Sequence, residues 1–137
     1  MAGETTNHFT AYNIPTSRQA GVLVTQFQQF EVLTTELQLA DVLKVGELPT
    51  NALLHAVILK TDDLDSNGSE ALVWDIKQNT TTFKAGITNA TALAGTVAVG
   101  EPVLTTAATA VNLVAATAAA TGAAGTINVT LIYSTLS

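Results

Sequence analysis

The stretch TINVTLIYS, residues 126–134, decides the fold class of this chain. Its large apolar side chains recur at every second position, and small polar residues stand between most of them. Because successive side chains of a β-strand point to opposite sides, this period of two predicts a strand with one buried face. The residues expected on that face are Ile127, Val129, Leu131 and Tyr133.

The same period appears farther back in the chain, at residues 111–116 and 72–77. The sequence ATAAATGAAG, residues 116–125, contains two glycines and predicts a long hairpin loop before the final strand. A helix is the competing interpretation of residues 107–120, since alanine has the highest helix propensity. The threonines, the valines and the period of two favour a strand. The inward residues expected in these segments are Val111, Leu113, Ala115, Leu72, Trp74 and Ile76.

Residues 21–30, GVLVTQFQQF, show the alternation in the front half of the chain. Leu23 and Phe27 share one face of the expected strand. The phase then changes at the two glutamines, so that Phe30 and Val32 continue the apolar set. This change predicts a β-bulge or a strand end there, with both phenylalanines in the core.

Residues 34–43, TTELQLADVL, have apolar residues at helical spacing, which predicts a short helix. The remaining alternating segments bring the chain to seven or eight strands, which pack most naturally as an antiparallel, jelly-roll-like β-sandwich. We therefore expect an all-β fold with a single sandwich domain over residues 21–137. Residues 1–20 are polar and irregular, and they are expected to form an arm extended from that domain.

The composition limits the classes of partner. The chain has 137 residues and a net charge of −6, and no basic cluster that would hold a phosphate backbone, so nucleic acid is not an expected partner. Only 12% of its residues are charged, against about 25% in an average domain, which indicates that a partner covers part of the surface. Residues 102–137 carry no charge, but their alternation and their glycines favour strands over a membrane span. The first 21 residues lack the apolar run of a secretory signal.

An acidic segment, TDDLDSNGSEALVW at residues 61–74, begins like the calcium loop of an EF-hand. Position twelve of that loop, counted from Asp63, is Trp74 where the bidentate glutamate should stand. We favour a β-hairpin turn in which the aspartates accept hydrogen bonds from nearby backbone amides. An oxygen cage for a hard cation remains the alternative, with ligands from Asp62, Asp63, Asp65 and Glu70.

No motif for catalysis or for cofactor binding is present: the sequence lacks a nucleophile elbow, a phosphate-binding loop and a dinucleotide fingerprint. The chain contains no cysteine and two histidines, His8 in the polar arm and His55 inside an apolar strand. We expect His55 to be packed or at an interface, because no second histidine lies near it to share a metal. No enzyme, no metal site and no cofactor is therefore predicted.

Two long stretches resemble the capsid decoration proteins of tailed bacteriophages, also called cement or head-stabilising proteins. They are ADVLKVGELPTNALLHAVILKTDDLDSNGSEALVWDI, residues 40–76, and AATAAATGAAGTINVTLIYS, residues 115–134. The resemblance implies a jelly-roll sandwich that assembles as a homotrimer on the outer surface of the virion capsid. It also implies a non-enzymatic role in which the protein bridges neighbouring major capsid proteins.

The predicted arm offers the candidate contacts with the capsid or with other subunits, because it combines apolar side chains with one basic residue. A carbohydrate-binding or host-adhesion β-sandwich module on a virion is the alternative function, and it requires an exposed aromatic platform and a calcium ion in the turn from Asp62 to Glu70. An enzyme acting on small acidic substrates is a third and weaker interpretation. The candidate contact residues are Phe9, Tyr12, Ile14, Pro15 and Arg18.

Overall fold

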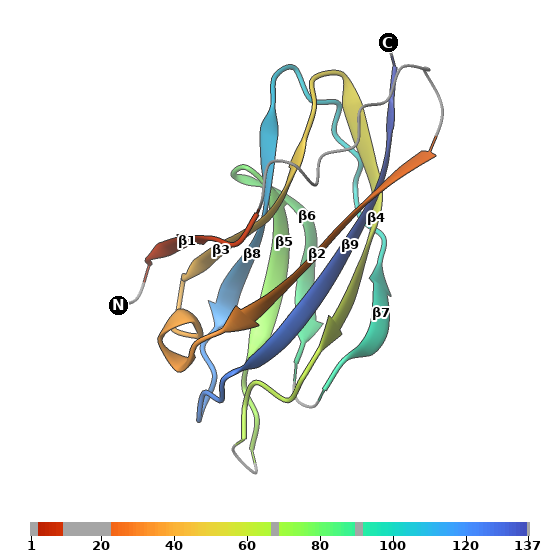
Figure 1. Ribbon diagram of the computed structural model, residues 1–137. Coiled ribbons are helices and arrows are strands. Elements are labelled where there is room, and N and C mark those ends of the chain that lie inside the picture. Colours follow the sequence, from red (N-terminus) through yellow and green to blue (C-terminus); the bar gives the residue numbers. More distant parts are fainter. Residues whose placement is uncertain (1–2, 10–22, 67–68, 90–91, 137) are drawn as a thin grey trace.

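The computed structural model describes residues 3–9, 23–66, 69–89 and 92–136. Nine strands and one 3₁₀ turn, η2, are present in these ranges, and Figure 1 shows the strands in two layers that face each other. The elements in chain order are β1 (Thr5–Asn7), β2 (Leu23–Val32), η2 (Thr34–Glu36), β3 (Val42–Leu48), β4 (Ala52–Thr61), β5 (Val73–Gln78), β6 (Thr81–Thr88), β7 (Ala94–Ala98), β8 (Thr109–Thr117) and β9 (Gly125–Thr135).

One sheet has the strand order β1-β3-β8-β5-β6, and the other has the order β2-β9-β4-β7. The eight strands from β2 to β9 follow the order of a jelly roll, in which the chain passes from one sheet to the other at every connection except that between β5 and β6. All of their pairings within the described ranges are antiparallel. The predicted all-β jelly-roll sandwich is confirmed, and β1 is an additional edge strand that pairs in parallel with β3.

The core lies between the sheets and is built from the predicted alternating residues. The inward side chains of β9 are almost fully buried, and those expected from β8 and β5 are buried as well. Trp74, the one tryptophan, lies among them and donates its indole N–H to Asn89 Oδ1 at 3.1 Å. The period of two therefore identified the buried face of these three strands correctly.

Strand β2 differs from the prediction, because it pairs with β9 over its whole length without a register shift. Its inward side chains are Gln26, Gln28, Phe30 and Val32, whereas Phe27 points outward and is 53% exposed. The interior accepts Gln26 because β3 offers it a backbone partner. Its side-chain Nε2 donates to Glu47 O at 2.9 Å, and its Oε1 accepts from Glu47 N at 3.1 Å.

Two predicted hairpins are wrong. β4 and β5 belong to different sheets, as do β8 and β9, so the connections after Thr61 and after Thr117 cross from one layer to the other. The predicted helix at residues 34–43 is only the single turn η2, since Asp41 Oδ2 accepts from Gln38 N at 2.9 Å and β3 begins at the next residue.

Within the described ranges, no helix is both long enough and apolar enough to span a membrane.

Candidate functional site

The acidic segment is built around Asp65, whose side chain is completely buried at one end of the sandwich. The carboxylate joins two connections that lie far apart in the sequence, residues 62–72 and residues 118–124. It accepts hydrogen bonds from four backbone N–H groups, those of Ala71 at 2.8 Å, Leu72 at 3.3 Å, Ala120 at 2.8 Å and Thr121 at 2.9 Å. Asp65 thus holds these two connections together.

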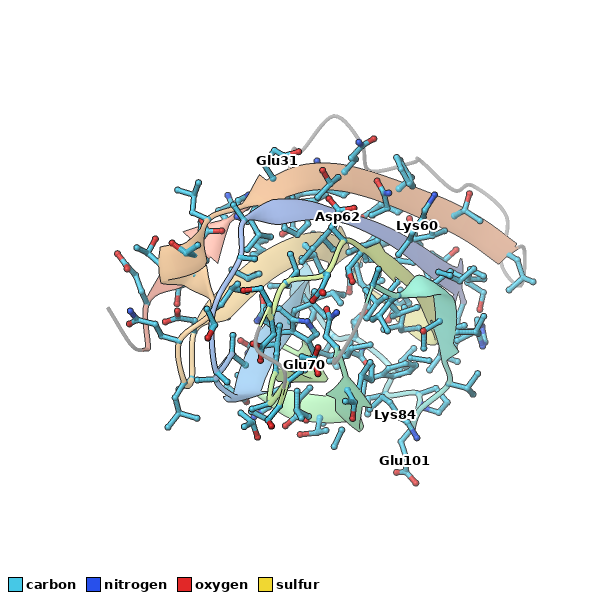
Figure 2. The ribbon with its side chains drawn as sticks, turned by 90° about the horizontal axis from the view of Figure 1, so that it is seen from below. Glu31, Lys60, Asp62, Glu70, Lys84 and Glu101 are labelled. Carbon is cyan, nitrogen blue, oxygen red and sulfur yellow. The ribbon has the colours of Figure 1, made fainter. Side chains whose placement is uncertain are left out.

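The other acidic residues of the segment point to different partners. Asp62 Oδ2 accepts from Thr126 N at 3.0 Å, and Asp63 Oδ1 accepts from Asp65 N at 3.2 Å. Figure 2 looks at this end of the molecule and shows Asp62 and Glu70 well separated. Within the described ranges, no three acidic or histidine side chains are placed to hold a metal ion. As predicted, the aspartates accept hydrogen bonds from backbone amides. The segment links two sheets, however, and is not a hairpin.

A different surface has the properties of a binding site: the outer side of the sheet β2-β9-β4-β7, called here the four-strand face. Directly paired residues of an antiparallel sheet lie on the same side, so the register defines rows of neighbours. One row crosses all four strands as Phe27, Thr130, Ile58 and Val97. The next row is Gln29, Asn128, Lys60 and Ala94.

A shallow hollow of about 370 Å³ opens on the four-strand face. Phe27 stands on its rim, and Val97 of the same row is 59% exposed. The Oδ1 atom of Asn128 is shielded from solvent and has no hydrogen-bond partner among the described residues. The hollow therefore combines the apolar side chains of Phe27 and Ile58 with polar neighbours. Its lining residues are Phe27, Gln29, Ile58, Lys60, Gly95, Asn128 and Thr130.

The two outer faces of the sandwich differ in charge. The strands of the four-strand face carry two charged side chains on their outer side, Glu31 on β2 and Lys60 on β4, and Figure 2 shows both on this layer while Lys84 and Glu101 lie toward the opposite one. The outer face of the five-stranded sheet carries both signs, at Lys44, Glu47, Asp75, Lys77 and Lys84. Since interface centres are poor in charge and rich in aromatic residues, the four-strand face is the better candidate for a partner-covered surface.

Phe9 is the one candidate contact of the arm that the structure describes. Its side chain is 8% exposed and lies against its own domain, with the Lys44 ammonium 5.4 Å from the ring centroid. Tyr12, Ile14, Pro15 and Arg18 lie outside the described residues. Strand pairing already begins at Thr5, inside the region predicted as an extended arm.

Sequence reasoning missed the two features that define these surfaces. Phe27 was expected in the core, yet Gln26, Gln28, Phe30 and Val32 form an unbroken period of two that places it outside. Leu23, Thr25 and Phe27 also follow a period of two in the opposite phase, and only the contact of Gln26 with Glu47 decides between the two phases. Nothing in the sequence indicated that His8 would stack on Phe30, with ring centroids 4.2 Å apart.

No model of a known protein family matches the sequence, and no curated protein matches it either. Solved structures with the same fold do match. One is a chain of the cyanophage Pam1 capsid asymmetric unit, with a TM-score of 0.70 and 25% identity, covering 89% of this chain and 91% of that chain. Another is a chain of the capsid of Ralstonia phage GP4, with a TM-score of 0.68 and 25% identity, covering 88% and 89%.

This chain is similar to components of phage capsids. The likeness extends over about nine tenths of both chains in each comparison, so it includes the whole sandwich and not a shared motif. It supports a structural role in a virion.

Proposed function

We propose that the protein is a non-enzymatic decoration protein that binds the outer surface of a phage capsid and stabilises it by bridging major capsid proteins. The observation that carries the proposal is the match to two phage capsid chains over nearly their full length. The four-strand face supports it independently, because an exposed sheet surface whose strands carry only two charged side chains, Glu31 and Lys60, is suited to burial against a protein partner.

Such a role requires binding but no chemistry. A ligand that binds only the intact state stabilises it by about 2.7 kcal/mol when its free concentration is 100 times its Kd. Each decoration protein would contribute a term of this order, and the terms add over the many copies on one shell. Opening of the capsid would then become strongly unfavourable even if each copy binds weakly.

The proposed partners are the major capsid protein and further copies of this chain, in a homotrimer. The proposed contacts are the four-strand face and the arm residues Phe9, Tyr12, Ile14, Pro15 and Arg18, with residues 1–20 as the arm and 21–137 as the sandwich. Neither nucleic acid nor membrane is a proposed partner, since the net charge of −6 repels phosphate groups.

Capsids assembled without this protein provide the test. We expect the purified protein to co-sediment with them and to raise the temperature at which they open in calorimetry. Phe27→Lys should weaken binding at least about tenfold, because a charge would be buried in an apolar contact. Thr82→Lys, at an exposed position of β6 on the other sheet, is the matched control. Equal binding by both variants would exclude the four-strand face, and absence of binding by the wild type would exclude the proposed function.

A carbohydrate-binding module on a virion is the second candidate, and Phe27 is the observation that favours it. Its exposed ring stands beside the amides of Gln29 and Asn128 around the hollow, and such a mixture of aromatic and polar groups can stack on and hydrogen-bond a sugar. Glycan binding that is lost in Phe27→Ala, with unchanged capsid binding, would favour this candidate. If EDTA abolishes glycan binding, a calcium ion takes part in that binding. Capsid binding that is insensitive to EDTA favours decoration.

A further inference from the structure

The edge strand β1 is an addition to the jelly roll. It pairs in parallel with β3, whereas every other described strand pair is antiparallel. Without β1, strand β3 would form an open edge with unpaired backbone groups. Val42 N donates to Glu4 O at 2.9 Å, and His8 N donates to Lys44 O at 3.0 Å. Backbone hydrogen bonds to an open edge are the usual means by which a separate strand binds a sheet.

The side chains of residues 4–9, called here the arm segment, fit specific partners. His8 Nε2 lies 3.2 Å from Glu36 Oε2, and its ring stacks on Phe30. Phe9 is buried under the Lys44 ammonium. At the other end of the segment, Glu4 N donates to Asp41 Oδ1 at 3.1 Å. We call the receiving surface the arm cradle; it consists of Phe30, Glu36, Asp41, Val42 and Lys44.

The arm segment and its cradle are separate units of the chain. All cradle residues lie between positions 30 and 44, and the thirteen residues 10–22 stand between Phe9 and the start of β2. A sequence of that length can span at most roughly 45–50 Å. None of the contacts depends on the segment and the cradle belonging to the same molecule. Docking within one chain and docking between two chains therefore differ only in loop closure and local concentration.

We propose that in the assembled protein each copy inserts its arm segment into the cradle of a neighbouring copy. This inference rests on the self-association that forms part of the proposed function. In a closed oligomer, a neighbour's cradle stands at an effective concentration in the millimolar range, so exchange carries little penalty. Exchange of an identical element is a low-cost route to oligomers. It would also join the subunits through β-sheet hydrogen bonds that hold the oligomer together on a capsid.

Engineered disulfides test the exchange, since the wild-type chain contains no cysteine. Thr5 and Val42 are direct partners in the β1–β3 register and line the same surface hollow, away from the His8 and Phe9 contacts. One chain carries Thr5→Cys and a second, size-tagged chain carries Val42→Cys. The two are refolded together, oxidised and separated on a non-reducing gel. A covalent heterodimer is the expected main product.

The control pairs Thr5→Cys with Thr88→Cys, which lies on β6 at the opposite edge of the same sheet and should give no heterodimer. A third protein carries Thr5→Cys and Val42→Cys in one chain. It should form covalent dimers and larger species if arms are exchanged, and only an intrachain disulfide if they are not. Circular dichroism and light scattering on each variant first establish that it folds and that it has the mass of the wild type.

An oligomer that forms only intrachain disulfides would overturn the exchange and leave the proposed function standing. A monomer at every concentration would overturn both the exchange and the proposed self-association. Phe9→Ala should lower the yield of heterodimer severalfold, because it removes the buried anchor of the segment.

Discussion

At the scale of single residues, buried polar side chains fasten segments of the fold that are distant in the sequence. Asp65 accepts hydrogen bonds from four backbone N–H groups, two from residues 6 and 7 positions away and two from residues 55 and 56 positions away. From inside the core, the Gln26 side chain forms hydrogen bonds with both the backbone N–H and the backbone carbonyl of Glu47. In each case the polar side chain replaces a strand partner that the local backbone lacks, so its burial stabilises the fold.

Asp65→Asn should therefore destabilise the protein strongly. The side-chain NH₂ of asparagine would replace one carboxylate oxygen, and it cannot accept hydrogen bonds from the backbone N–H groups that face it. Hydrogen bonds to a charged acceptor contribute about 1.5–3 kcal/mol each. We expect a loss of about 3 kcal/mol or more in the free energy of unfolding measured with urea. Asp63→Asn is the control and should cost no more than about 1 kcal/mol, because Asp63 is exposed and accepts one backbone N–H. Equal losses would contradict the role assigned to Asp65.

Tyr133 should titrate abnormally. Burial raises the pKa of its phenol above the ordinary value of 10.0, and the nearby Gln26 side chain opposes part of the rise. Both polar groups of that amide are already bonded to Glu47, and the Tyr133 hydroxyl has no hydrogen-bond partner among the described residues. The folded state therefore keeps the proton to a higher pH than the unfolded state does.

The sign of the pH dependence follows from this pKa. The stability linked to Tyr133 is fully present below pH 10 and is lost as the pH rises through the higher folded-state value. In a Tyr12→Phe background, Tyr133 is the only tyrosine, and the ultraviolet absorbance of its phenolate reports its ionisation. We expect that signal to appear above pH 10 in folded protein and to coincide with alkaline unfolding. A midpoint at or below 10 in the folded state would contradict the burial argument.

At the scale of elements, the two sheets approach each other most closely where β3 faces β9 and β2. The register of β3 shifts between Lys44 and Gly46, and a side chain at Gly46 would collide with the Leu131 methyl group and lie 2.9 Å from Gln26 Oε1. This position requires glycine because of space, since its backbone is not in the left-handed region.

Gly46→Ala should destabilise the fold by about 1–3 kcal/mol through overpacking. A double-mutant cycle with Leu131→Ala tests the cause, since removing the obstructing methyl groups should make the glycine substitution less costly. The four unfolding free energies are measured with urea. Additive effects of the two substitutions would show that Leu131 is not the obstacle.

At the scale of the whole molecule, charge is distributed unevenly over a sandwich with a net charge of −6. The strands of the four-strand face carry two charged side chains, Glu31 and Lys60, and acidic residues gather at the end of the sandwich that holds Asp62 and Asp63. The acidic end would repel another copy.

We expect a homotrimer in solution, with a mass near three times 14.1 kDa by light scattering and the same mass with calcium or with EDTA. The mass should not depend on calcium, because Asp62, Asp63 and Asp65 are bonded to backbone amides and do not converge. A monomer that associates only when calcium is added would contradict this expectation and favour the glycan-binding alternative.

The sequence alone determined the strands and most of their buried faces, because the alternation of side chains is a local property of an extended backbone. β9, β8 and β5 show this clearly. The sequence also predicted that the aspartates of the acidic segment accept hydrogen bonds from backbone amides. Only the tertiary structure decided which sheet each strand joins, and therefore that the connections after β4 and β8 cross between layers. It also decided that Gln26 lies inside and Phe27 outside. The partner that makes burial of Gln26 favourable is the backbone of Glu47, 21 positions away, and no local pattern reports a contact of that kind.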